Sequence, residues 1–238
     1  MLPAIQPPSL LHSTVILAMS ADGKIADRDR TAARFSSRAD LAHLETQIAA
    51  ADAVLIGGGT LRAYGTTLPV RRPSLVEQRQ QRGQPEQPMH IIWSPSGNLD
   101  PGCRFFQQAV PRGLLTTAAA AEFWRTQGGF EQVWAVSENP WNWHQAMELL
   151  HASSIGRLAV LGGGRLVAEL LKEQLVQELF LTLCPLLLGG ETAPTPVDGL
   201  GFLATAAPQL QLISCEIVDQ EIFLHYRVEA KTLPSENS

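Results

Sequence analysis

Short apolar runs alternate along this chain with stretches of helical periodicity, and this alternation constrains the fold more than any other feature. The run at 52–57, DAVLIG, is continuously apolar after its aspartate, which is typical of a strand buried on both faces. The stretch at 36–51 repeats its apolar residues at i, i+3 and i+7, and Ser36 or Ser37 can cap it. Repeated strand–helix units predict an α/β protein with a mostly parallel sheet and helices on both faces.

The remaining elements follow from the same two patterns. Further strands are predicted at 13–20, 89–94, 112–117, 132–137, 157–161 and 178–190, and further helices at 118–127, 141–153 and 165–175. Two alternating strands within 208–229, around Asp219 and Gln220, predict an antiparallel hairpin at the edge of the sheet. Residues 71–88 are polar and rich in proline, and we predict a long loop or flap there.

These elements predict one domain, residues 13–230, between loose tails at 1–12 and 231–238. The net charge of −5 argues against nucleic acid or an anionic membrane as a partner. No apolar run approaches the ~20 residues that span a bilayer, and the start of the chain lacks the pattern of a signal peptide. The three cysteines are far apart, without metal-ligand spacing, which favours reduced thiols in a cytoplasmic protein and predicts no metal site.

Two glycine triplets follow predicted strands, and they are the strongest candidates for a binding site. Gly162, Gly163 and Gly164 separate a strand from a helix, and Arg165 adds a positive charge at the helix start. Unpaired N–H groups and the helix dipole attract anions at such a point. The triplet at 57–59 precedes Thr60, a hydroxyl donor or N-cap, and a short turn. Tight turns alone would also explain the glycines.

Neither triplet fits the better-known nucleotide motifs. The sequence contains no G-x-x-x-x-G-K-[ST] loop, and no G-x-G-x-x-G with an acidic residue ~20 positions further on. A P-loop ATPase and a standard Rossmann dehydrogenase are therefore not supported. The H-x-E of zinc deaminases appears at His43 to Glu45, but the P-C-x-x-C that must accompany it is missing.

Three segments together resemble the reductase domain of bacterial riboflavin biosynthesis. They are ILAMSADGKIA, DAVLIGGGTLRA and LGGGRLVAELLKEQLVQELFLTLCPLLLGGE, in the same order and with similar spacing. The resemblance extends over roughly residues 13–228. It implies a three-layer α/β/α fold like that of dihydrofolate reductase. It also implies a homodimer, to which the apolar hairpin points as well, and an NADPH-dependent reduction at C1′ of the ribose of 5-amino-6-(5-phosphoribosylamino)uracil, which leaves a ribityl chain.

The resemblance also assigns individual residues. Positions that match cofactor contacts of the family are Ala18, Thr60, Ser94, Gly162, Gly163, Gly164, Arg165 and Leu166. Leu68 and Arg71 match substrate contacts, and a guanidinium such as that of Arg71 pairs well with a phosphate. Lys24 lies in the S-x-D-G-K motif, where it is either a solvated turn residue or a substrate-binding group near the phosphate of substrate or cofactor.

Two departures from the family pattern lie on the substrate side. Tyr64 and Gly65 stand where an acidic residue usually follows the G-T-x-R-A motif, and Leu161 replaces a glutamate that contacts substrate. The loss of polar anchors favours an altered specificity. Two alternatives therefore remain open: a reductase of the same fold for another small molecule, or a non-catalytic dimer that binds a nucleotide.

Some features stay undecided at the level of sequence. Hydride transfer needs no catalytic triad, so the residues do not identify a catalytic group; ordered water and Lys24 are the two options for the proton donor. NADPH is not distinguished from NADH, although Arg62 and Arg165 are candidate partners for a 2′-phosphate. For Trp141 and Trp143, packing at a helix start is favoured over stacking on nicotinamide.

Overall fold

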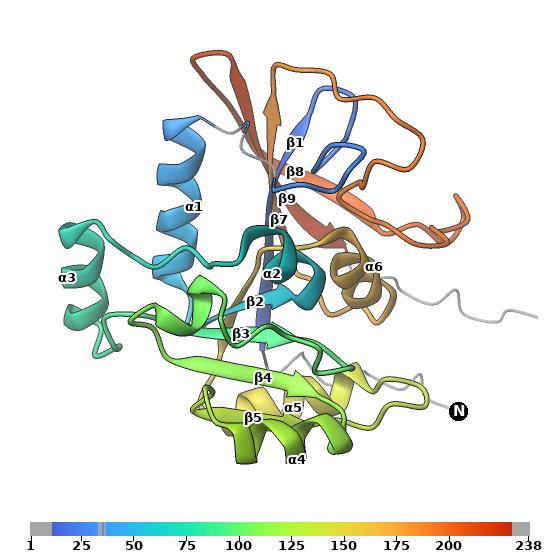
Figure 1. The fold of residues 1–238 in the computed structure, drawn as a ribbon. Helices are drawn as coiled ribbons and strands as arrows, with labels where there is room; N and C mark the ends of the chain where they lie inside the picture. The colour runs from blue at the N-terminus through green and yellow to red at the C-terminus, as the bar shows by residue number, and fades with distance from the viewer. Residues whose placement is uncertain (1–10, 33–34, 36, 230–238) are drawn as a thin grey trace, which may run out of the picture.

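A computed structural model describes residues 11–32, 35 and 37–229, which form one nine-stranded sheet with helices on both faces (Figure 1). The strands are β1 (His12–Ser20), β2 (Ala53–Gly57), β3 (Met89–Trp93), β4 (Arg112–Thr116), β5 (Gln132–Ala135), β6 (Arg157–Val160), β7 (Glu178–Cys184), β8 (Gln209–Val218) and β9 (Glu221–Glu229). Their order across the sheet is β5-β4-β3-β2-β6-β1-β7-β9-β8. Residues 1–10 and 231–238 of the two predicted tails lie outside the described residues.

The sheet is parallel from β5 to β7, and β9 then pairs antiparallel with both β7 and β8. This confirms the predicted mixed sheet and its C-terminal hairpin. The strand β6 is inserted between β1 and β2, because Ala159 pairs with Thr14 on one side and with Val54 on the other. Strands from distant parts of the chain therefore meet at the centre of the sheet.

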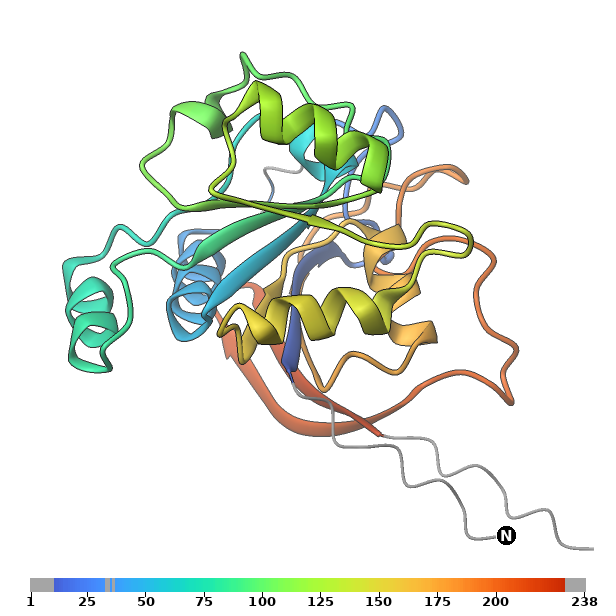
Figure 2. The same ribbon diagram turned by 90° about the horizontal axis from the view of Figure 1, so that it is seen from below.

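Helices cover both faces of the sheet and complete a three-layer α/β/α structure. They are α1 (Arg38–Ala50), α2 (Gly58–Tyr64), α3 (Pro73–Gln81), α4 (Ala118–Gln127), α5 (Trp143–Ala152) and α6 (Gly164–Lys172), with a 3₁₀ turn at Arg104–Gln107. One buried apolar cluster packs α5 and α6 against one face of the sheet. A second cluster packs the helices α1, α2, α3 and α4 against the other face. Figure 2 shows α4 and α5 on opposite sides of the strands β4 and β5.

The prediction of a loop at 71–88 was wrong, because α3 occupies residues 73–81. Pro73 stands in the first turn, where its fixed φ and missing N–H favour a helix start. The helix buries little apart from Leu75 and Arg79. The Arg79 guanidinium donates hydrogen bonds to the carbonyls of Ala49 and Ala51 at the end of α1. A buried arginine thus attaches this helix to the rest of the protein, where most helices use a row of apolar residues. The apolar periodicity that predicts a helix is therefore absent from the sequence.

The described residues also bear on the expected absences. In these ranges no helix is both long and apolar enough to cross a bilayer. No group of His, Cys, Asp and Glu side chains within the same ranges forms a metal-binding cluster. Ser37 caps α1 by accepting a hydrogen bond from the N–H of Asp40; the other candidate cap, Ser36, lies outside the described residues.

Candidate active site

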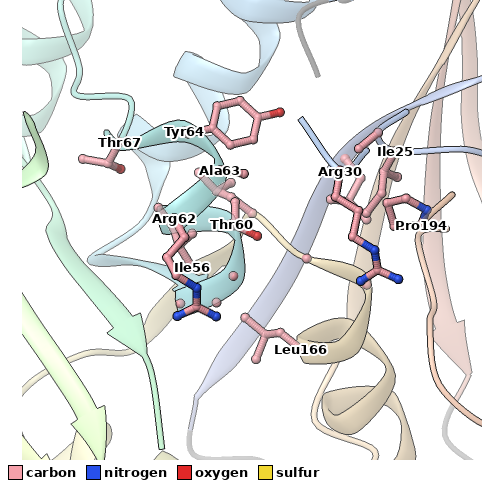
Figure 3. Close-up of a pocket in the computed structure, with 18 of the residues that line it drawn as sticks. Ile25, Arg30, Ile56, Thr60, Arg62, Ala63, Tyr64, Thr67, Leu166 and Pro194 are labelled. Atoms are coloured by element: carbon pink, nitrogen blue, oxygen red, sulfur yellow. The ribbon is translucent and has the colours of Figure 1, made fainter. Parts of the chain in front are cut away.

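A pocket of about 740 Å³ lies at the carboxyl ends of the central strands. Residues after β1, β2, β3 and β6 line it, together with parts of α1, α2 and α6. Figure 3 shows Thr60 and Arg62 on α2 facing Leu166 on α6, with Arg30 and Pro194 on the opposite side. Ligands of open α/β sheets bind at this edge of the strands.

The start of α6 lies at one end of this pocket. Gly163 is the N-cap and makes no side-chain capping bond, and the first intrahelical bond runs from the N–H of Val167 to its carbonyl. The N–H groups of Gly164, Arg165 and Leu166 have no acceptor among the described residues, and all three residues line the pocket. Such a helix start, with its dipole and the nearby guanidinium, fits the phosphates of a nucleotide.

The two glycine triplets lie side by side, because β2 and β6 are neighbours. The N–H of Gly57 donates to the carbonyl of Gly162 at 2.9 Å. Gly162 does not line the pocket; it shapes the turn, with φ at +88°, where side chains are disfavoured. A Cβ on Gly163 would lie 3.2 Å from the Thr60 hydroxyl oxygen, so the two loops pack closely beside the pocket.

Not every glycine serves the ligand. A Cβ on Gly164 would clash with the carbonyl oxygen of Thr195, and a Cβ on Gly58 would lie 3.2 Å from the Ser94 side chain. These two glycines allow close packing within the protein. A Cβ on Gly59 would meet only the far end of the Arg62 side chain, at 3.9 Å, so no close contact within the protein requires a glycine there. All three of these glycines line the pocket. The choice between turn geometry and ligand contact is therefore answered differently from one glycine to the next.

The segment after β2 differs from its prediction. Instead of a short turn, residues 58–64 form α2, whose N-cap is Gly57 and not Thr60. Thr60 lies inside the helix and lines the pocket. Ala18 near the end of β1 and Ser94 after β3 line it as well. The structure thus brings these three predicted cofactor positions to the same cavity as the start of α6.

The other end of the pocket lies between α1 and the segment that follows α2. Leu68 and Arg71, the predicted substrate positions, both line it, and Arg71 is exposed. Tyr64 and Leu161 also line the pocket. The two departures from the family pattern therefore face the cavity, where they make its wall more apolar than two carboxylates would.

Lys24 lies apart from the pocket lining, and its ammonium group donates to the carbonyl of Ala193. Its motif links two loops. Ser20 donates to the Asp22 carboxylate, which also accepts hydrogen bonds from the N–H groups of Leu188 and Gly189. These bonds, that from Ser20 first, lower the pKa of Asp22 to about 2. The S-x-D-G-K motif thus ties the loop after β1 to the loop after β7.

A buried histidine supports the pocket wall from behind. Thr67 lines the pocket, and its hydroxyl lies 2.7 Å from Nδ1 of His90 on β3. Burial first, and then the charge of Arg79, lower the pKa of His90 to about 3. The imidazole therefore stays neutral, and it fixes the Thr67 side chain without adding charge.

Several pocket residues had no recognisable signal in the sequence. Arg30 belongs to an irregular segment, Arg104 begins the 3₁₀ turn, and Trp93 is the last residue of a buried strand. With Arg62, Arg71 and Arg165, the described lining holds five guanidinium groups against the carboxylates of Asp40 and Asp198. This excess of positive charge suits ligands that carry several phosphates. Only the folded chain brings these arginines together.

Comparison with known proteins agrees with this geometry. The family model described as the RibD C-terminal domain matches residues 12–224. A 2,5-diamino-6-ribosylamino-4(3H)-pyrimidinone 5′-phosphate reductase of Archaeoglobus fulgidus is 31% identical over 79% of this chain and 87% of that protein. The riboflavin biosynthesis protein RibD of Chlamydia pneumoniae is 27% identical over 86% of this chain, but this chain spans only 54% of it.

Solved structures support the same fold. A pyrimidine reductase-like protein of Corynebacterium diphtheriae superposes with a TM-score of 0.77 over 94% of both chains, at 21% identity. Dihydrofolate reductase of Enterococcus faecalis superposes with a TM-score of 0.52 over 92% of this chain and all of that one, at 13% identity. The fold is thus that of dihydrofolate reductase, as the resemblance implied. From the family match and the 31% identical relative, this chain belongs to the RibD C-terminal domain family, the reductase family of riboflavin biosynthesis.

Proposed function

We propose that this protein uses NADPH to reduce the ribosyl group of a phosphoribosylaminopyrimidine to the ribityl form in riboflavin biosynthesis. The observation that carries the proposal is the pocket itself. It has free N–H donors at the start of α6 and an exposed arginine, Arg71, at its other end. A dinucleotide and a phosphorylated substrate need anion-binding groups at both ends of one cavity.

The residues present fit a bound NADPH. The N–H groups of Gly164, Arg165 and Leu166 would hold its phosphates, and Thr60 and Ser94 would contact it from the strand ends. When bound, NADPH supplies the hydride. The arginine-rich lining favours the cofactor with the additional 2′-phosphate over NADH.

The protein's own groups would orient the substrate. Arg71 would pair with the substrate phosphate, and Leu68 would contact the substrate beside it. Because the two ligands would share one cavity, binding would orient the ribose toward the nicotinamide. The position of the Lys24 ammonium on the Ala193 carbonyl, outside the lining, favours water over Lys24 as the source of the proton.

The test has two steps. Titration of NADPH and NADH against tryptophan fluorescence, to which Trp93 in the pocket contributes, should show micromolar or tighter binding with a preference for NADPH. The protein is then incubated with NADPH and either the 2,5-diaminopyrimidinone or the deaminated uracil substrate, and NADPH absorbance is followed. Oxidation with either substrate supports the proposal, and its rate identifies the preferred ring.

A second candidate, reduction of another small molecule, rests on Tyr64 and Leu161 in the pocket wall. Binding of NADPH without turnover of either pyrimidine would favour it. Absence of any nucleotide binding would contradict both candidates and leave a non-catalytic role.

We also propose that the protein is a cytoplasmic homodimer. The edge strand β8 exposes a row of apolar side chains, Leu210, Leu212, Ile213 and Ile217. Exposed apolar patches of this kind mark association surfaces. Cys103, Cys184 and Cys215 are free thiols, which suits a reducing compartment. Sedimentation velocity should give a dimer that Ile217→Lys weakens; a wild-type monomer would contradict the proposal.

A further inference from the structure

The segment between α2 and α3 carries both proposed substrate contacts, and side chains from other elements hold its backbone. The carboxamide of Gln108 pairs with both backbone groups of one residue in this segment. The N–H of Thr67 donates to Oε1 of Gln108 at 3.0 Å, and Nε2 of Gln108 donates to the carbonyl of Thr67 at 2.9 Å. The planar amide thus occupies the N–H and C=O of Thr67 together, as a neighbouring strand would.

Gln87 repeats this arrangement three residues further on. The N–H of Val70 donates to Oε1 of Gln87 at 2.8 Å, and Nε2 of Gln87 donates to the carbonyl of Val70 at 2.8 Å. The N–H groups of Arg71 and Arg72 both donate to the carboxylate of Glu45 on α1. Three side chains from separate parts of the chain therefore fix the backbone of residues 67–72.

One residue in this segment keeps both of its backbone polar groups without a partner among the described residues. Pro69 has no N–H, so Leu68 holds the only backbone N–H between Thr67 and Arg72 that lacks an acceptor among the described residues. The Leu68 carbonyl has no donor within those ranges either. Leu68 is half-buried and lines the pocket. Backbone polar groups of a half-buried residue beside a pocket are expected to form hydrogen bonds with a ligand or with ordered water.

The two glutamines indicate which ligand group fits the unpaired N–H and C=O of Leu68. The planar carboxamide presents a carbonyl oxygen and an N–H along one edge. Gln108 and Gln87 each use this pair to bind the backbone of one residue. A pyrimidinone ring carries the same O=C–N–H pair in its lactam. The free N–H and C=O of Leu68 are complementary to that edge of the ring.

We propose that Gln108 and Gln87 are positioning residues that hold the segment so that the backbone N–H and C=O of Leu68 bind the lactam edge of the pyrimidine. This inference rests on the proposed function, because it names the atoms that read the ring of that substrate. It also gives the ring two polar contacts in a pocket wall where Tyr64 and Leu161 replace carboxylates.

The test compares Gln108→Leu and Gln87→Leu with Gln80→Leu, which removes an exposed amide on α3 outside the pocket lining. We expect the KM for the pyrimidine substrate to rise about tenfold in the first two variants and to stay unchanged in the control. The kcat should change less than threefold, and the NADPH dissociation constant should stay within twofold of wild type. A general loss of folding would alter all of these values together.

Amide hydrogen exchange supplies a measurement that needs no turnover. In the free protein the amides of Thr67 and Val70 should exchange slowly and that of Leu68 quickly; Gln108→Leu should lose the protection at Thr67. Substrate bound with NADP⁺ should protect Leu68. If Gln108→Leu does not fold, Gln87→Leu carries the same test through Val70.

The outcomes separate the two proposals. A wild-type protein that turns over neither pyrimidine would contradict the proposed function. Wild-type turnover combined with an unchanged KM in both glutamine variants, or with a Leu68 amide that substrate leaves unprotected, would overturn the present inference alone.

Discussion

Replacement of Gly163 by valine tests where the cofactor phosphates bind. The backbone of Gly163 is extended, with φ −79° and ψ −178°, angles that residues with a side chain also adopt. Its Cβ would lie 3.2 Å from the hydroxyl oxygen of Thr60, closer than ordinary contact, and the two methyl groups of valine need further room. Because the ends of β2 and β6 beside Gly163 are buried, we expect the new side chain to displace Thr60 and to intrude on the proposed phosphate site.

The magnitude follows from the hydrogen bonds at risk. A hydrogen bond to a charged group contributes about 1.5–3 kcal/mol. The loss of one such bond at the start of α6 predicts NADPH binding that is about 10- to 100-fold weaker, or about 1.4–2.7 kcal/mol. Alanine, which has no such methyl groups, should fall between glycine and valine.

The assay is fluorescence titration of NADPH, with thermal unfolding to confirm that each variant is folded. Gly156→Ala is the matched control, because Gly156 precedes the same strand at its opposite end and its Cβ would make an ordinary contact 3.5 Å from Asp52. An unchanged dissociation constant in a folded Gly163→Val protein would refute the placement of the phosphates at this loop.

Three further predictions concern the substrate phosphate and the response to pH. Arg71→Ala should raise the KM for the phosphorylated pyrimidine about 10- to 100-fold without changing the NADPH dissociation constant, and an equal loss for a substrate lacking the phosphate would contradict the pairing. Asp22 has its pKa lowered from 3.8 to about 2, so its ionised form stabilises the fold above pH 3.8 and this contribution is lost as the pH falls through 2; chemical unfolding of Asp22→Asn should show a weaker pH dependence between these values. His90 has its pKa lowered from 6.5 to about 3, so between those pH values the unfolded chain binds one proton more than the folded protein. The free energy of unfolding of the wild type should therefore decrease by up to about 1.4 kcal/mol for each unit by which the pH is lowered in this range. His90→Gln should remove this slope, and parallel curves for the two proteins would count against a buried neutral histidine.

The elements that were predicted correctly are those whose signal is local. The helix at 118–127 has its N-cap threonine and its following glycine in adjacent sequence, and it was placed to the residue. The continuously apolar run that forms β2 is equally self-contained. The helix α3 was missed because its stabilisation comes from Arg79 reaching the end of another helix. Such a contact leaves no pattern within residues 71–88.

The same distinction holds for the site. The resemblance assigned Thr60, Ser94 and the start of α6 to one cofactor, and the structure brings them to one cavity. Local sequence could not assign Gly164, whose missing side chain makes room for Thr195 far along the chain. The clamp of Gln108 on Thr67 joins two segments that no periodicity relates.

The insertion of β6 between β1 and β2 has a consequence for how the protein is made. β1 pairs only with β6 and β7 among the described strands, so it has no partner until residues 157–184 have been synthesised. An apolar strand that waits so long is exposed to mispairing and aggregation. β2 to β5 are neighbours in chain order and can associate earlier. The pocket, whose lining extends to Asp198, therefore forms only after that residue has been translated, and a ligand bound there can stabilise the newly made chain only from that point.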